Sequence, residues 1–249
     1  MFDIEPGGSR KYYLRQARYY ELAQDIASLV QKQFSTETPC NLLDVGVDTG
    51  VSRLYIQHFI KNDTSLIRYS AIDLPNKDPN RIHGHNDWII YPLDLNEGLE
   101  KHLEVPEQYF DIIICEQVLE HLLYPQMTLR DIYRLLKPGG TLILGVPSFI
   151  PPLHLARKHI VPVLDKIFKV KKIRGHIQAW CKYTFLKDIK TNCPGVQIEH
   201  VRGFRIVSGG IIAFLENYRW YWQLNRFIGR IVPSLCTEIQ VVCTKPMDS

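Results

Sequence analysis

The sequence predicts an α/β domain built on a doubly wound, mostly parallel sheet with helices on both faces, and two patterns indicate it. The first is alternation: from residue 41 onward, short apolar runs alternate with stretches that carry apolar side chains at helical spacing. The second is composition, because the runs are nearly continuous in Leu, Ile and Val, as is typical of parallel strands covered on both faces. A chain of 249 residues is long enough for one such domain with a buried core.

Each predicted element rests on its own stretch of sequence. Residues 11–34 contain no Gly or Pro and have apolar residues at helical spacing, which predicts one long amphipathic helix. The apolar runs that predict strands lie at 41–45, 69–73, 88–94, 111–115 and 141–146. The stretches between them that predict helices lie at 51–61, 117–123 and 125–136. Towards the end of the chain we expect a helix at 183–191 and strands at 196–205 and 238–244.

Composition narrows the class of protein. Hydrophobic residues make up 45% of the chain and charged residues 22%, and no apolar run approaches the roughly 20 residues that cross a bilayer. Residues 1–15 lack the apolar stretch of a secretory signal, so we expect a cytoplasmic protein with reduced cysteines. A net charge of +4 is too small to indicate nucleic acid as a partner. The six cysteines contain no CxxC pair, so neither a zinc site nor a disulfide scaffold is expected.

The strongest sign of a binding site is the stretch LLDVGVDTG from Leu42 to Gly50, where a predicted strand ends in a turn before a helix. Gly46 allows the chain to turn sharply, and Gly50 allows backbone to approach a ligand at the helix N-terminus. Asp73 ends the next strand, where a carboxylate can accept both hydroxyls of a ribose. Ligands of such sheets bind at the carboxyl ends of the strands, so we expect the site there.

A dinucleotide site is the competing interpretation of this turn. It requires the pattern G-x-G-x-x-G, and the chain has Asp48 and Val51 in place of the second and third glycines. Without those glycines a pyrophosphate loses its close approach to the backbone, whereas a ligand with a ribose but no phosphate loses less. An NAD-dependent oxidoreductase therefore stays as the less favoured enzyme.

Two further motifs extend the pattern. The chain has PLDL at 92–95, and the fourth predicted strand continues as DIIICEQVLEHL at 111–122 before LLKPGGT at 135–141. In this order and spacing, residues 41–147 resemble the class I S-adenosylmethionine-dependent methyltransferases, specifically the small-molecule group with an EVLEHL-type motif and an LKPGG turn. The resemblance implies a Rossmann-like sheet of seven strands with an antiparallel last strand, and S-adenosylmethionine as the cofactor.

The resemblance also assigns residues to the cofactor. They follow the carboxyl ends of the first four strands: Asp44, Gly46, Val47, Gly50, Asp73, Leu74, Asp94, Leu95, Cys115 and Glu116. It implies that the glycine turn lines the methionine end, that Asp73 holds the ribose and that Asp94 meets the adenine amine with Leu95 beside it. Cys115 and Glu116 are expected to flank the sulfonium.

The chain departs from the family at Asp48, where a middle glycine is usual. Asp tolerates left-handed backbone better than most residues, so the turn can persist, but a carboxylate there would repel the carboxylate of the cofactor. We expect Asp48 to face solvent. The departure keeps a non-catalytic S-adenosylmethionine-binding protein as an alternative.

Catalysis of methyl transfer rests largely on positioning, because the reaction is an in-line displacement that needs a base only when the acceptor loses a proton. His121 is the candidate general base, and a histidine that packs or caps within the fold is the alternative. Some relatives bind a divalent metal through a glutamate at the position of Gln117, so no metal is expected here.

We interpret residues 1–249 as a single methyltransferase domain with a helical cap at 1–35, a cofactor-binding core at 36–146, and insertions at 147–182 and 206–236 that form an acceptor lid. Tyrosines of the first helix either close over the cofactor or pack: Tyr12, Tyr13, Tyr19 and Tyr20. The first insertion has a basic cluster that suits a phosphate, a carboxylate, an anionic membrane or simple solvation: Arg157, Lys158, Lys166, Lys169, Lys171, Lys172 and Arg174.

The second insertion mixes aromatic residues and arginines with few acids at 214–230. This composition suits a lid over a hydrophobic acceptor, an interfacial helix at a membrane or a core helix, and we favour the lid over the membrane. The expected function is methyl transfer to oxygen or nitrogen of a small molecule: a sugar, a lipid or quinone precursor, or a secondary metabolite.

Overall fold

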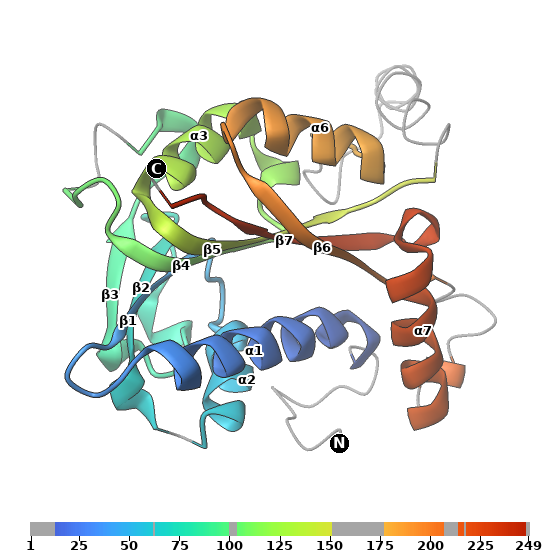
Figure 1. The fold of residues 1–249 in the computed structure, drawn as a ribbon, viewed down its shortest axis with the longest axis horizontal. Helices are drawn as coiled ribbons and strands as arrows, with labels where there is room; N and C mark the ends of the chain where they lie inside the picture. Colours follow the sequence, from blue (N-terminus) through green and yellow to red (C-terminus); the bar gives the residue numbers. More distant parts are fainter. Residues whose placement is uncertain are drawn as a thin grey trace.

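The computed structural model describes residues 13–61, 63–99, 104–150, 177–206, 214–216 and 218–247. Figure 1 shows a central sheet with α1, α2 and α7 on one face and α3 and α6 on the other. The helices span α1 (Tyr13–Gln33), α2 (Val51–Phe59), α3 (Pro125–Leu135), α6 (Lys182–Asn192) and α7 (Arg219–Ile231). Tyr12 and the basic cluster at 157–174 lie outside the described residues.

The described strands form one sheet in the order β3-β2-β1-β4-β5-β7-β6. Their bounds are β1 (Cys40–Val45), β2 (Ile67–Asp73), β3 (Trp88–Pro92), β4 (Phe110–Glu116), β5 (Leu136–Pro147), β6 (Gln197–Phe204) and β7 (Glu238–Thr244). Adjacent strands among the first five are parallel, and β7 is antiparallel to both β5 and β6. The predicted seven-stranded, doubly wound sheet with an antiparallel last strand is confirmed.

Burial on both faces explains the continuous apolar runs. Successive residues of β4 enter different hydrophobic clusters: Ile112 and Ile114 pack on the α1 side, and Ile113 and Cys115 on the α3 side. Because side chains alternate across a strand, a strand covered on both faces must be apolar at every position. All six cysteines are buried and unpaired within this core.

The predicted helix at 117–123 is wrong. After β4 the chain forms only a short 3-10 turn at Leu119–His121, and α3 begins at Pro125. Gln117 has a φ of 58°, in the left-handed region that a right-handed helix cannot include. The stretch has apolar residues at helical spacing because Leu119 and Leu122 are buried in the core.

Strand β1 lies in the middle of the sheet, where the strand order reverses. The chain runs outward from β1 to β3 and then returns to place β4 on the other side of β1. In doubly wound sheets the loops diverge at this point and leave a crevice at the carboxyl ends of the strands.

Candidate functional site

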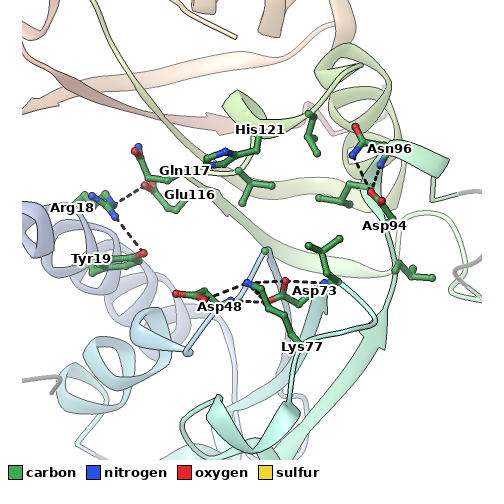
Figure 2. Close-up of a pocket in the computed structure, with 16 residues that line it drawn as sticks. Arg18, Tyr19, Asp48, Asp73, Lys77, Asp94, Asn96, Glu116, Gln117 and His121 are labelled. Carbon is green, nitrogen blue, oxygen red and sulfur yellow. Dashed lines mark hydrogen bonds and ion pairs between the residues drawn. The ribbon is translucent and has the colours of Figure 1, made fainter. Parts of the chain in front are cut away.

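A cavity of about 450 Å³ lies at this crevice, as Figure 2 shows. Its lining combines residues of α1 with the loops that follow four strands: Arg18, Tyr19, Gly46, Asp48, Asp73, Leu74, Lys77, Leu93, Asp94, Leu95, Asn96, Glu116, Gln117, Val118, His121 and Leu122. Most of the residues that the sequence assigned to the cofactor lie among them. The exceptions are Asp44, Val47, Gly50 and Cys115, which are absent from the lining.

Asp73 fixes the turn after β1. Its Oδ2 accepts a hydrogen bond from the backbone N–H of Asp48 at 2.9 Å, and its Oδ1 accepts one from the N–H of Leu74 at 2.8 Å. The Nζ of Lys77 lies 3.2 Å from the carboxylate of Asp73 and 3.2 Å from Oδ1 of Asp48. Burial opposes the charge of Lys77, but these carboxylates outweigh it and raise its pKa.

Asp48 has left-handed backbone, with a φ of 48°. Its side chain is 71% exposed and pairs with Lys77, which agrees with the expectation that it faces solvent. Lys77 itself was not among the predicted site residues. The position of this lysine, four residues after Asp73, could have indicated a site residue, but lysines in loops are ordinarily solvated.

The other predicted turn residues hold the backbone in place. A Cβ at Gly46 would overlap the side chain of Val118, and the φ of Gly46 is 75°. The carboxylate of Asp44 is buried and accepts a hydrogen bond from the hydroxyl of Ser52, which joins β1 to the first turn of α2. Burial raises the pKa of Asp44 to about 7, although the Ser52 hydrogen bond acts in the opposite direction.

Glu116 brings a buried carboxylate to the opposite wall of the cavity. Its Oε1 accepts a hydrogen bond from Nε2 of Gln240 at 2.6 Å, and its Oε2 lies 3.5 Å from Nε of Arg18. Burial raises the pKa of Glu116 to about 7, against the attraction of the Arg18 guanidinium. Arg18 also donates to Oε2 of Glu238 at 2.9 Å, so it links α1 to β7.

The first helix closes this wall with two neighbouring residues. Figure 2 shows Arg18 beside both Glu116 and Tyr19, and the guanidinium of Arg18 lies 4.7 Å from the Tyr19 ring centroid. Of the predicted tyrosines, Tyr19 lines the cavity, whereas Tyr20 packs in the core against Phe59. The side chain of Tyr13 lies outside the described residues. Sequence reasoning missed Arg18.

Asp94 and His121 also line the cavity. Oδ1 of Asp94 accepts hydrogen bonds from the backbone N–H of Asn96 at 2.9 Å and from its amide Nδ2 at 3.0 Å. The side chain of His121 is 45% exposed, and its Nε2 lies 3.8 Å from Oε1 of Glu120. Among the described residues, no group of three or more His, Cys, Asp or Glu is arranged to hold a metal ion.

The charges of the lining favour some ligands over others. Four carboxylates line the cavity, against the cations of Arg18 and Lys77: Asp48, Asp73, Asp94 and Glu116. A pyrophosphate would be repelled by this surplus of negative charge. A ligand with ribose hydroxyls, an exocyclic amine and a positive centre fits it, because carboxylates accept hydrogen bonds and attract cations.

A comparison with protein families now identifies the domain. The family model described as a methyltransferase domain matches residues 13–183, more than half of the chain. The chain belongs to this methyltransferase family. The predicted membership in the class I S-adenosylmethionine-dependent methyltransferases is thereby confirmed, and the family and fold imply use of S-adenosylmethionine in general.

Curated relatives match only part of the length of this chain. A demethylmenaquinone methyltransferase of Chlamydia trachomatis is 29% identical over 162 residues, which are 62% of this chain and 64% of the relative. A hybrid PKS-NRPS synthetase of Neonectria sp. is 28% identical over 137 residues, which are 54% of this chain and 3% of the relative. The chain thus spans less than two thirds of each of these relatives.

Solved structures share the fold over nearly the whole chain. An S-adenosylmethionine-dependent methyltransferase of Mesorhizobium loti has a TM-score of 0.53 and 16% identity, with 88% of this chain and 96% of the other covered. The [4+2]-cyclase SpnF has a TM-score of 0.52 and 17% identity, with 92% and 82% covered. A cyclase is named for a different reaction from methyl transfer, so the fold alone does not define the chemistry.

Proposed function

We propose that the protein binds S-adenosylmethionine in the cavity and transfers its methyl group to a small-molecule acceptor, at oxygen or nitrogen. The observation that carries this proposal is the convergence of Asp73, Asp94 and Glu116 on one cavity at the switch point of the sheet. Among the buried polar atoms of the lining, Nε2 of Gln117 makes no hydrogen bond within the described part of the chain, and Oε2 of Glu116 has only the 3.5 Å ion pair with Arg18. A polar ligand supplies the partners that such atoms need.

Each carboxylate has a role in this proposal. Asp73 accepts the ribose hydroxyls, one of which takes the place of Lys77 on the carboxylate. Asp94 accepts the adenine amine at Oδ2, since Oδ1 is already bonded to Asn96. Glu116 attracts the positive sulfonium. When bound, the cofactor supplies an activated methyl group, and the protein holds the acceptor in line with it.

Calorimetric titration tests the cofactor. We expect heat of binding with S-adenosylmethionine and none with NAD, and the opposite result would overturn the proposal. Asp73→Asn is expected to weaken binding by about tenfold, because a ribose hydroxyl loses a charged acceptor. Asp63→Asn is the matched control, since Asp63 is an exposed carboxylate that bonds Ser65 and does not line the cavity.

Among the acceptor classes, a quinone or lipid precursor has the most support. The demethylmenaquinone methyltransferase of Chlamydia trachomatis supports this class by its name, and four leucines give the cavity apolar walls: Leu74, Leu93, Leu95 and Leu122. Incubation with labelled S-adenosylmethionine and a native metabolite extract identifies the product. Label in a polar sugar alone would exclude the quinone or lipid class.

We propose His121 as the general base for an acceptor that loses a proton. Its side chain lines the cavity near the loop that follows β4. His121→Ala is expected to lower kcat by roughly 100-fold while the affinity for the cofactor stays the same. An unchanged kcat would show that the imidazole only packs against Glu120.

A second candidate is a protein that binds S-adenosylmethionine without transferring the methyl group. The ion pair between Asp48 and Lys77, set in the turn where relatives have glycine, favours it. Heat of binding with no labelled product from any extract would support this candidate. A methylated product would exclude it.

A further inference from the structure

Helix α7 presents an apolar stripe to solvent. Four residues form it, at spacings of four, three and four, and they are 54%, 43%, 63% and 63% exposed: Trp220, Leu224, Phe227 and Ile231. This spacing brings them onto one side of a helix. We call these four residues the α7 stripe.

The other side of α7 is fixed to the protein. Trp222 packs edge-on against Tyr20 of α1, with ring centroids 5.4 Å apart. Gly229 lies against β6 so closely that a Cβ would overlap the carbonyl oxygen of Gly203. The exposure of the stripe is therefore not the result of a loosely placed helix. Rotation of α7 towards the core would break these contacts.

Charge suggests what covers the stripe. Helix α7 contains three arginines and no acidic residue. Arg219, Arg226 and Arg230 follow one another at spacings of seven and four along one flank of the stripe, but Arg226 is largely buried and paired with Glu21. Arg219 is exposed, and the side chain of Arg230 is 57% exposed although it also pairs with Glu21. A partner that is apolar inside and anionic at its surface complements this helix.

We propose that α7 docks the protein on a bilayer that contains anionic lipids. The α7 stripe enters the boundary between headgroups and acyl chains, and Arg219 and Arg230 meet lipid phosphates. Aromatic side chains beside arginines are typical of helices that lie in this interface. Among the residues that the structure describes, no helix has the length and apolarity to cross a bilayer, so the contact is one of docking.

The position of α7 gives this docking a consequence for the cavity. The helix follows the carboxyl end of β6 and precedes β7, so it lies at the same edge of the sheet as the cavity (Figure 1). It also packs on α1, which supplies Arg18 and Tyr19 to the cavity wall. Docking therefore brings the cavity edge towards the bilayer. That docking helps to capture a hydrophobic acceptor rests on the proposed function, whereas the docking itself does not.

Cosedimentation with lipid vesicles tests the proposal without any need for turnover. We expect the full chain to bind vesicles of phosphatidylcholine with phosphatidylglycerol and to bind pure phosphatidylcholine more weakly. The combined variant Trp220→Gln, Phe227→Gln and Ile231→Gln is expected to lose more than about tenfold in vesicle affinity. Arg219→Gln is expected to lose about fivefold on anionic vesicles only.

The matched control replaces two hydrophobic residues that are equally exposed elsewhere. Ile89→Gln with Tyr183→Gln is expected to bind vesicles like the wild type, since these side chains are 55% and 65% exposed and lie far from α7 in sequence. Circular dichroism establishes that each variant is folded, and Phe227→Gln alone replaces the combined variant if that one unfolds. Calorimetry with S-adenosylmethionine separates loss of docking from loss of the proposed function.

Three results would overturn the proposal. The first is a wild-type protein that does not bind anionic vesicles. The second is equal binding by the stripe variant and the control. The third is a wild-type protein that forms a dimer and does not bind vesicles, together with a stripe variant that is a monomer. The stripe would then be an interface between copies of the chain.

Discussion

The ammonium of Lys77 pairs with two carboxylates, that of Asp73 at the end of β2 and that of Asp48 in the turn where the resemblance predicts glycine. Asp48 and Asp73 would otherwise place two negative charges beside each other at the mouth of the cavity, because the backbone N–H of Asp48 bonds directly to Asp73. The pair between Asp48 and Lys77 thus compensates for the departure from glycine, and it does so in a region that solvent screens.

Substitution of Asp48 separates the effect of its charge from that of its backbone. Asp48→Gly is expected to lower the Kd for S-adenosylmethionine severalfold, because it removes a carboxylate near that of the cofactor and suits a φ of 48°. Calorimetry measures the change. Asp48→Asn removes only the charge, so equal gains in both variants indicate electrostatics. Weaker binding by Asp48→Gly would contradict the proposed position of the cofactor.

Sequence patterns located the carboxylates of the site but not their cationic partners. Asp73, Asp94 and Glu116 each end or follow an apolar strand, so the strand pattern places them at one edge of the sheet. Arg18 lies on a helix, and its partners Glu116 and Glu238 belong to β4 and β7. Helical spacing defines a face of the helix but not what lies across from it, so this contact required the tertiary structure.

Among the elements, the inner strands β1 and β4 were predictable because they are buried on both faces, whereas the edge strands β3 and β6 are partly exposed. The conformation of the segment 117–123 was not predictable, since buried leucines in a short irregular turn give the same spacing as one side of a helix. Its true conformation depends on the left-handed backbone of Gln117. A glutamine has no intrinsic preference for that region, so tertiary contacts rather than local sequence determine it.

The contact between α7 and β6 predicts an unusual response to a helix substitution. Glycine to alanine within a helix ordinarily stabilises by up to about 1 kcal/mol. Gly229→Ala is expected instead to destabilise the protein by about 1 to 3 kcal/mol, because the new methyl group overlaps the Gly203 carbonyl. Chemical denaturation measures this, with the exposed Gln223→Ala on the same helix as control. A stabilised Gly229→Ala would show that α7 moves away from β6 without cost.

At the scale of the whole molecule, buried acids make stability depend on pH. Burial raises the pKa of Asp44 and Glu116 to about 7 and that of Glu120 to about 8. These groups bind protons more tightly in the folded state, so their contribution is present at low pH and is lost as pH rises through these values. We expect the free energy of unfolding to fall by a few kcal/mol between about pH 5 and about pH 9.

Thermal denaturation across this range checks the prediction. Glu116→Gln keeps an acceptor for Gln240 but has no proton to lose, so its stability is expected to fall less steeply than that of the wild type. Equal slopes for the two proteins would show that Glu116 does not titrate in this range.

Glu21 joins three distant parts of the chain. Its buried carboxylate pairs with Arg202 of β6 at 3.1 Å and with Arg230 of α7 at 2.9 Å, and also with Arg226. These arginines lower the pKa of Glu21 although burial opposes them. Glu21→Ala is expected to destabilise the protein by about 3 kcal/mol, because the largely buried Arg226 loses its carboxylate partner, whereas Arg202 keeps Asp25. Denaturation with the exposed Glu37→Ala as control measures this loss.

The ion pairs of Glu21 also join segments that are made at different times during synthesis. Its partners are made some two hundred residues later, so α1 leaves the ribosome long before Arg202, Arg226 and Arg230 exist. The nascent chain can assemble β1 to β5 in order, but the wall that contains Arg18 and Tyr19 closes only when the C-terminal segments fold. The cavity wall therefore joins segments that are translated far apart in time.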